Sequence, residues 1–506
     1  MAVTSQRASN RLGFGVLAGL ALLALPILIR PFGGDQSLYL LMADRLRHGA
    51  VLYRDVWDVK QPGLPFFYML ASALAGGSSA GPHVAEFSLL LAFAFVLQRA
   101  VPVRSSALKV VSPIVVLAPY LIDSRVGDLT QLEFLVGLPM FMCLWCTSNP
   151  HAQHSTRPWA LIAGAGLSAG IVGYFKLAYL PIPLAMWFVA ELHRDAALRR
   201  KLIRSSQFIG WLLLSWAPLV VYTLHFHLWR DLYDTWFVFP RSMTSLGGRP
   251  ASRLLISVVS IAAVLAPLLF LAILGAARRV RQRRFNTWTT NCFVWLIVAG
   301  FGVLVQNWWR YHFYIFLVPV GLLALDAIDS GMSPHETSRA ASKAFTIVVG
   351  ALCLIPIVDG RELWRHLGQS HLALEQNARG RFQTREDEYR AKVAAELAPR
   401  RTIKGPIGVF YFGSPELQRA AGDPLITAVH GWSPEFYSTA IWERLSAELL
   451  RAQPSAVYVD SFSAPFVHGR GRLVQDWLER SFRFRARTPD GTWYFSSPLP
   501  STPAAK

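Results

Sequence analysis

The chain has 506 residues, of which 53% are hydrophobic and 16% are charged, and its formal net charge is +19. This apolar content exceeds that of an ordinary soluble domain and places the chain among membrane proteins. The basic residues lie largely in short loops such as RRKLIR (199–204) and RRVRQRR (278–284), as in loops that face anionic lipid, and this distribution argues against a nucleic-acid partner.

Apolar segments in chain order predict a mainly α, polytopic membrane protein with about eleven transmembrane helices, roughly 10 to 13, each long enough to cross the hydrocarbon layer. The first segment has arginines at both ends and no A-x-A cleavage site, so we expect a retained signal anchor. The predicted spans are residues 13–29, 83–98, 109–122, 129–147, 159–174, 177–190, 207–226, 253–276, 289–305, 313–328 and 344–358.

The basic loops also predict the orientation of the chain. A cytoplasmic N-terminus puts the loops near 99–109, 192–206, 277–288 and 329–343 on the inside, as the positive-inside rule requires. Residues 31–82, which we call the first loop, and all residues after 358 then lie outside. We therefore predict a membrane domain over 1–358 and an extracytoplasmic domain over 359–506.

The first loop carries two predicted helices. Residues 35–48, DQSLYLLMADRLRH, have helical apolar spacing against charged residues, which is typical of an amphipathic helix at the interface. Residues 62–76 are apolar but short and contain prolines, which favours a juxtamembrane or re-entrant helix. Asp35 either caps the start of the amphipathic helix or takes part in chemistry.

Three groups of charged residues lie where lipid begins, at a cost of about 2.5 to 3.5 kcal/mol for a charge at the centre of a span. In the first loop, YRDVWDVKQPG brings Asp55, Asp58 and Lys60 to the interface, either for a site or as a solvated loop anchored by Tyr53 and Trp57.

The second group follows in YLIDSRVGDLTQLEF (120–134), where Asp128 and Glu133 belong either to a site or to a cluster with Asp123 and Arg125 that neutralises itself. The third group comprises Lys176, Arg310 and His312. Lipid snorkelling explains each of these cations separately. Their place on the predicted outer face, together with the carboxylates, favours a shared anionic ligand in a single pocket.

After residue 358 the pattern becomes that of a water-soluble α/β domain. We expect a helix over 361–376, strands over 407–412 and 456–460, helices near 434–452 and 471–482, and paired strands FRFRAR and TWYFSS. This domain has no phosphate loop, metal-ligand spacing or nucleophile motif. Cys143 and Cys146 form a C-x-x-C, which is also the spacing of a redox or zinc pair. All four cysteines lie in apolar runs, however, and are interpreted as buried thiols.

Carboxylates beside cations suit a reaction in which a hydroxyl loses its proton while a phosphate departs. A carboxylate acts as general base, and Lys or Arg stabilises the charge on the phosphate. No acid is then needed to activate the leaving group.

These motifs in this order resemble the integral-membrane glycosyltransferases of the C-type superfamily (GT-C), in the branch of protein O-mannosyltransferases, aminoarabinose transferase and rhizobial core transferases. The resemblance covers about residues 10–330 and rests on DQSLYLLMADRLRHGAVLYRDVWDVKQPG, DSRVGDLTQLEF, GYFKLAYL and RYHFYIFLVPVGLLAL.

The resemblance implies that Asp35 is the catalytic aspartate. It also implies that Lys60, Lys176, Arg310 and His312 bind the carrier phosphate. Two positions depart from the pattern: many relatives have an acidic residue where this chain has Gln36, and many read Lys-Pro-Pro where it reads Lys60-Gln61-Pro62. The first departure leaves a divalent metal unsupported, and no cofactor is predicted.

We therefore expect an inverting glycosyltransferase of the bacterial plasma membrane that moves a monosaccharide (hexosyl or pentosyl) from a polyprenyl-phosphate carrier to an envelope glycan, lipid or protein on the outer face. Its predicted partners are the donor, the acceptor and membrane lipids. The alternatives are a transporter or flippase for lipid-linked saccharides, and a scaffold without catalytic activity.

Overall fold

The computed structural model describes residues 2–30, 32–123, 129–148, 158–246, 250–282, 286–331, 386–402 and 408–496. The chain forms two compact units. Unit 1 comprises Met1–Ile29, Pro82–Val220 and Pro250–Phe382, and unit 2 comprises Arg30–Gly81, Val221–Arg249 and Gln383–Lys506. The predicted domain boundary at residue 358 lies outside the described residues.

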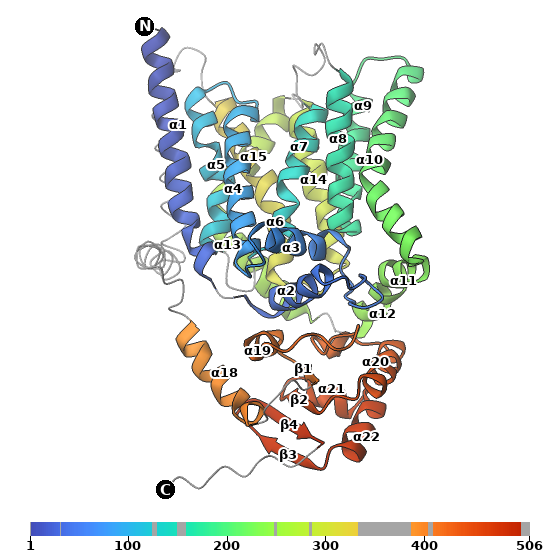
Figure 1. The fold of residues 1–506 in the computed structure, drawn as a ribbon. Helices are drawn as coiled ribbons and strands as arrows, with labels where there is room; N and C mark the ends of the chain where they lie inside the picture. The colour runs from blue at the N-terminus through green and yellow to red at the C-terminus, as the bar shows by residue number, and fades with distance from the viewer. Residues whose placement is uncertain are drawn as a thin grey trace. The chain divides into compact units, whose positions relative to one another are not determined.

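Unit 1 is built from long apolar helices, several of which run side by side in Figure 1. Its helices in chain order are α1 (Ala2–Ala24), η1 (Leu25–Ile29), α4 (Gly81–Ala100), α5 (Ser106–Asp123), α6 (Leu132–Leu135), α7 (Gly137–Ser148), α8 (Pro158–Phe175), η4 (Leu177–Tyr179), α9 (Pro181–Leu192), α10 (Leu198–Phe226), α13 (Ala251–Gln282), α14 (Thr287–Leu304), η6 (Arg310–Phe316) and α15 (Leu317–Gly331). The last turns of α10 are grouped with unit 2.

The structure confirms the predicted fold class of a polytopic helical membrane protein. Each of the first ten predicted spans coincides with helical structure, and the eleventh, 344–358, lies outside the described residues. Among the described residues, seven helices are long and apolar enough to cross a membrane alone, and four apolar segments are shorter. The predicted span 129–147 is divided into α6 and α7.

Small residues let the helices of unit 1 approach closely. Gly166 and Gly170 of α8 lie against α10, and Gly275 of α13 lies against Ala327 of α15, so that a Cβ at any of the three glycines would collide with its neighbour. Because lipid provides no hydrophobic drive between helices, such close contacts are a main source of helix association in a membrane. Cys143, Cys146 and Cys292 are buried free thiols, as predicted.

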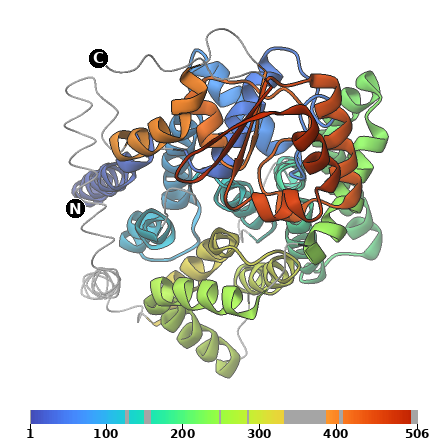
Figure 2. The same cartoon turned by 90° about the horizontal axis from the view of Figure 1, so that it is seen from below.

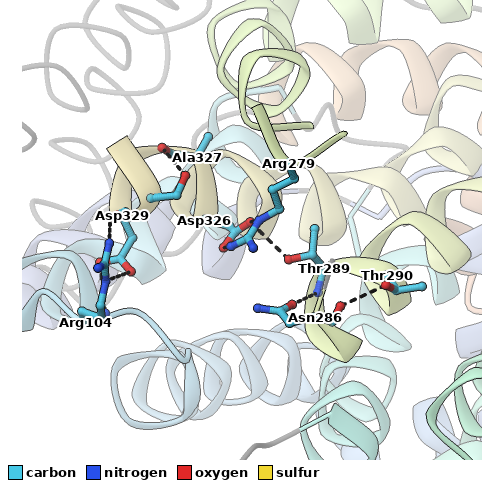
Figure 3. A network of polar contacts seen from close by, with 9 residues as sticks. Arg104, Arg279, Asn286, Thr289, Thr290, Asp326, Ala327 and Asp329 are labelled. Atoms are coloured by element: carbon cyan, nitrogen blue, oxygen red, sulfur yellow. Dashed lines mark hydrogen bonds and ion pairs between the residues drawn. The ribbon is translucent and has the colours of Figure 1, made fainter. Parts of the chain in front are cut away.

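A polar network ties the end of α15 to its neighbours (Figure 3). Arg279 of α13 donates from Nε to Asp326 Oδ2 at 2.6 Å, and Thr289 of α14 donates to the same oxygen at 3.2 Å. Arg104 donates from Nε to Asp329 Oδ2 at 3.2 Å. These carboxylates therefore fasten helices together.

Unit 2 contains the first loop, the segment after α10 and the C-terminal domain. The two helices predicted for the first loop are confirmed as α2 (Gly34–Arg47) and α3 (Gly63–Leu74). The other helices are α11 (Trp229–Tyr233), η5 (Asp234–Val238), α12 (Phe239–Leu246), α18 (Glu386–Arg401), α19 (Pro415–Ala421), η8 (Pro434–Phe436), α20 (Thr439–Ala452), α21 (Ala464–His468) and α22 (Arg472–Ser481).

A four-stranded sheet organises the C-terminal part, with strand order β1-β2-β4-β3. The strands are β1 (Val409–Phe412), β2 (Ala456–Asp460), β3 (Phe484–Arg487) and β4 (Gly491–Phe495). β1 and β2 are parallel, and the other pairs are antiparallel. All four predicted strands are thus confirmed. The helix expected at 434–452 is interrupted, because Ser438 caps a new helix by accepting from Ile441 N at 3.4 Å.

Helices cover both faces of this sheet, as Figures 1 and 2 show. On one face Val393 and Leu397 of α18 pack against Tyr411, Tyr458 and Trp493. On the other face Phe412 stacks on Trp442 of α20 at 6.0 Å between ring centroids. Side chains alternate between the two faces of a sheet, and both faces are covered here, so β1 is buried along its whole length. The helix expected over 361–376 lies outside the described residues.

Candidate functional site

Asp35 lies in the first turn of α2 but does not cap the helix. Gly33 is the N-cap residue, and its N–H donates to Gln36 Oε1 at 2.7 Å. The capping interpretation of Asp35 is therefore wrong, since Gly33 holds the N-cap position and the Asp35 carboxylate accepts from Trp432 instead. The helix dipole still favours a carboxylate at this position.

Two side chains contact the Asp35 carboxylate. Trp432 Nε1 donates to Oδ1 at 2.7 Å, and Lys60 Nζ lies 3.8 Å from Oδ2. The Asp35 and Lys60 side chains are each 23% exposed, so both remain accessible to small molecules. Lys60 Nζ also lies 5.6 Å from the ring centroid of Tyr39. One carboxylate oxygen is thus held by a neutral donor, and the other lies beside a cation.

The other two carboxylates of the first loop have different surroundings. Asp55 Oδ2 accepts from Val51 N at 2.8 Å and from Arg54 Nη2 at 3.1 Å, which closes a tight turn. Burial opposes ionisation of Asp55, but these hydrogen bonds outweigh it and lower its pKa. Asp58 is 6% exposed and accepts from Val59 N at 2.6 Å.

Three residues of the C-terminal domain that sequence reasoning missed belong to this site. They are Trp432, His430 and Glu416. The His430 ring stacks on Trp57 at 6.4 Å between centroids with an interplanar angle of 27°. Burial lowers the His430 pKa, although the charge of Asp58 opposes this shift. Its Nδ1 accepts from Trp432 N at 3.1 Å, so a neutral ring carries its proton on Nε2.

Glu416 at the start of α19 is a half-buried acid that interacts electrostatically with Asp35. Burial raises the pKa of Glu416 to about 7, and the negative charge of Asp35 acts in the same direction. Ser414 Oγ donates to Glu416 Oε2 at 2.5 Å. At neutral pH this carboxyl is therefore divided between its protonated and ionised forms.

In unit 1 the structure brings together two other predicted residues. Lys176 Nζ donates to Glu133 Oε1 at 2.7 Å, and the Glu133 side chain is fully buried. Tyr179 OH donates to the same oxygen at 3.2 Å, and Lys176 also donates to Gln306. Removing a buried charge from such a pair leaves its partner without compensation.

The remaining predicted residues lie near this pair or outside the described part of the chain. Arg310 and His312 belong to η6, which packs against α6, the helix that carries Glu133. His312 is 7% exposed. Asp128 lies outside the described residues, as does Arg125.

A buried network around Glu86 in unit 1 was also missed. Glu86 accepts from Thr130 N and Thr130 Oγ1, both at 2.9 Å, and from Tyr120 OH. His83 Nδ1 lies 3.1 Å from Thr130 Oγ1. Thr130 has a positive φ of 53°, so this network holds a strained turn directly before α6. A glutamate inside a predicted apolar span was the signal available.

Within the described ranges, no group of three or more His, Cys, Asp or Glu side chains is arranged to hold a metal ion.

No protein-family model matches the sequence, and no curated protein matches it significantly. Solved structures match its fold. ArnT from Cupriavidus metallidurans bound to undecaprenyl phosphate aligns with a TM-score of 0.61 at 15% identity, over 96% of this chain and 98% of that chain. The same protein in the apo state gives 0.58 at 13% identity, over 98% and 99% of the two chains.

The oligosaccharyltransferase from Archaeoglobus fulgidus, in complex with zinc and sulfate, aligns with a TM-score of 0.51 at 15% identity. This alignment covers 95% of this chain and 73% of that chain. These neighbours are GT-C glycosyltransferases. The chain therefore shares the GT-C fold of these neighbours over nearly its whole length, whereas the resemblance predicted it over about residues 10–330.

Proposed function

We propose that this protein is an inverting glycosyltransferase that moves a monosaccharide from a polyprenyl-phosphate carrier to a cell-envelope acceptor. The observation that carries this proposal is the Asp35 carboxylate, with Oδ1 bound by Trp432 and Oδ2 near Lys60. The shared GT-C fold supports it, and so does the undecaprenyl phosphate named in the ArnT structure. The acceptor is an envelope glycan, lipid or protein.

In this proposal Asp35 Oδ2 accepts the proton of the acceptor hydroxyl. The hydroxyl oxygen attacks the anomeric carbon on the face opposite the phosphate, and a new C–O bond forms while the bond to the carrier phosphate breaks. The phosphate leaves with the bonding electron pair, and the configuration at carbon inverts. General base catalysis of this kind contributes about 10²- to 10⁴-fold to a rate.

Lys60 is the cation beside Asp35 and is proposed to stabilise the charge that develops on the phosphate. Lys176, Arg310 and His312 stay predicted as further carrier-phosphate ligands, and Asp55, Asp58, Asp128 and Glu133 as residues that bind or shape the substrate site. The membrane-spanning helices support residence in a bacterial plasma membrane. We further propose that the N-terminus is cytoplasmic and that the site faces outward.

The rival proposal is a transporter or flippase for lipid-linked saccharides. A flippase moves the intact donor across the membrane, whereas a transferase cleaves the bond between sugar and phosphate. A scaffold would do neither, and would leave Asp35, Lys60 and Lys176 freely replaceable.

Product analysis separates these proposals. The purified protein is incubated with a panel of undecaprenyl-phosphate sugars and an envelope extract, and free undecaprenyl phosphate and glycosylated acceptor are quantified. We expect the two products in equal amounts, with inverted configuration at the anomeric carbon by NMR. Movement of the intact donor across proteoliposomes without release of undecaprenyl phosphate would contradict a transferase.

A further inference from the structure

Residues 427–433, which we call the Trp432 segment, are held by hydrogen bonds from three directions. Gly413 N at the end of β1 donates to Gly431 O at 3.0 Å, and Val429 N donates to Glu448 of α20 at 2.9 Å. From the first loop, Trp57 N donates to Ala428 O at 2.9 Å. The segment is therefore fixed to the sheet, to α20 and to the first loop at once.

Trp432 itself is fixed at its backbone. Its N–H donates to His430 Nδ1, and its carbonyl accepts from Tyr437 OH at 3.2 Å. The next residue, Ser433, has a positive φ of 57°. Because the Trp432 backbone is already ordered in this way, little further conformational entropy is lost when its side chain contacts a partner.

The indole of Trp432 lies directly on the first turn of α2. A Cβ added to Gly34 would collide with ring atoms Cζ2 and Cη2 of Trp432, so only glycine admits the ring at this distance. This close approach brings Nε1 to 2.7 Å from Asp35 Oδ1, across 397 residues of sequence. Gly34 and Trp432 thus form one contact.

This contact orients Asp35 without competing for its chemistry. An indole N–H is a donor only, so it cannot take a proton from the acceptor hydroxyl. By holding Oδ1 it fixes the rotation of the carboxylate and leaves Oδ2 on the side of Lys60. A misplacement of about 1 Å in such a group can cost about 10²-fold in rate.

We propose that Trp432 is a positioning residue for Asp35, so that the C-terminal domain completes the transferase site. This inference rests on the proposed function. It assigns to the Trp432 segment a direct part in setting the geometry of the base, and it makes Gly34 necessary for that geometry.

The first test is Trp432→Phe, which keeps an aromatic ring and removes the N–H. We expect kcat to fall about 10- to 100-fold, with the KM for the lipid-linked donor within about twofold of wild type. The control is Trp229→Phe, an exposed tryptophan of α11 in the same unit. On an Asp35→Asn background, Trp432→Phe should cause no further loss. Wild-type kcat in Trp432→Phe, or an equal loss on both backgrounds, would overturn the proposal.

Gly34→Ala tests the same contact from the other side. The added methyl displaces the indole, so kcat should fall about as far as in Trp432→Phe while the protein still folds. The matched control is Gly19→Ala in α1, where a Cβ meets nothing within 4 Å. If Gly34→Ala and Gly19→Ala have the same turnover, the close approach of the ring has no role.

A spectroscopic readout separates failure of this inference from failure of the proposed function. With 5-fluorotryptophan at all 17 tryptophans, the ¹⁹F resonance that disappears in Trp432→Phe belongs to Trp432. We expect this resonance to move in Asp35→Asn and to stay in place in Asp44→Asn. If the Trp432 resonance does not move in Asp35→Asn, the proposed positioning contact is wrong even where sugar transfer is observed. If it moves but no donor is cleaved, the proposed function fails and the contact stands.

Discussion

Asp35 and Asp326 have similar exposure, with 23% and 17% of their side chains accessible, yet they have very different partners. Asp326 accepts a bidentate pair of hydrogen bonds from the Arg279 guanidinium and a further hydrogen bond from the Thr289 hydroxyl (Figure 3). Asp35 receives one indole N–H, and its second oxygen is 3.8 Å from an ammonium. Burial therefore does not distinguish the two carboxylates, whereas the geometry of their partners does.

The difference suggests a way to separate a structural carboxylate from one proposed to be catalytic. A bidentate guanidinium uses both oxygens of Asp326 and locks α13 to α15. At Asp35 one oxygen is fixed, and the side chain is 23% exposed, so the other oxygen can be reached by an acceptor hydroxyl as the proposed general base requires. Substitutions at Asp326 should therefore change stability, and those at Asp35 should change turnover.

Lengthening each side chain by one methylene should give the largest contrast. In Asp35→Glu the carboxylate is displaced from Trp432 and Lys60, so we expect turnover to fall about 10²-fold or more. In Asp326→Glu the flexible arginine can follow the carboxylate, and turnover should stay within about twofold. Steady-state assays of the two purified variants test this. Equal losses would mean that geometry at Asp35 is no more critical than at Asp326.

Removing the charge of Asp326 should destabilise the protein without changing its chemistry. Asp326→Asn leaves the Arg279 guanidinium partly buried without its counter-charge, at an expected cost of about 3 kcal/mol. Thermal unfolding in detergent should show a lower Tm, while turnover per folded molecule is retained. Asp44→Asn, on the exposed side of α2, is the control for charge removal. An unchanged Tm in Asp326→Asn would show that the network of Figure 3 adds nothing.

The Glu133–Lys176 pair in unit 1 is a case in which substitution can affect both stability and donor binding. Lys176→Met should lower the Tm, because it strands the fully buried Glu133, and Glu133→Gln in the same chain should recover about 2 kcal/mol of that loss. Comparing the donor KM of the double variant with that of wild type then tests the predicted phosphate contact of Lys176. A wild-type KM would leave Lys176 with a structural role alone.

Lys60→Gln should weaken catalysis moderately. The amide keeps a donor but not the charge, so we expect kcat/KM for the donor to fall about 10-fold, or about 1.4 kcal/mol. Lowering ionic strength should widen the gap between variant and wild type, since the lost term is electrostatic. A value equal to wild type at every salt concentration would exclude Lys60 from the site.

The smallest expected effect is a pH dependence from Glu416, whose pKa is raised from 4.5 to about 7. Below pH 4.5 Glu416 is protonated in both the folded and the unfolded chain, so its ionisation does not lower the free energy of unfolding. Between pH 4.5 and 7 the unfolded chain loses the proton first, and wild-type stability falls relative to Glu416→Gln. Discounted for partial exposure, the effect is about 1 kcal/mol, or about 2 °C in Tm. Parallel pH curves would contradict the raised pKa.

Local patterns explain why much of the fold could be predicted from the sequence. Helical periodicity over 35–48 anticipated α2. Short apolar or alternating runs anticipated β2 and the β3–β4 pair, because these signals depend on neighbours a few residues apart. The length of the membrane spans is determined by bilayer thickness, so these spans could also be predicted from the sequence. Lys60, Glu133 and Lys176 were named as separate charges because charges are costly near lipid, and the catalytic role of Asp35 was expected from the resemblance. The ion pair between Glu133 and Lys176 was not predicted.

The missed residues of the C-terminal domain lie where no local signal operates. Trp432 and His430 occupy a loop without periodicity, and their contacts with the first loop depend on how strands and helices of unit 2 pack. Glu86 did have a signal, as a charge inside an apolar span, but its compensating contacts with Thr130 and Tyr120 depend on the fold. Long-range contacts of this kind follow from the fold and are not visible in sequence spacing.

The most direct test of the central claim is the single-turnover rate of Asp35→Asn, with the donor bound before acceptor is added. Asp44→Asn is the matched control on the same helix. We predict that Asp35→Asn folds with wild-type Tm, binds donor normally and transfers sugar about 10²- to 10⁴-fold more slowly, because the acceptor hydroxyl has lost its base. Transfer at the wild-type rate by a correctly folded Asp35→Asn protein would contradict the account.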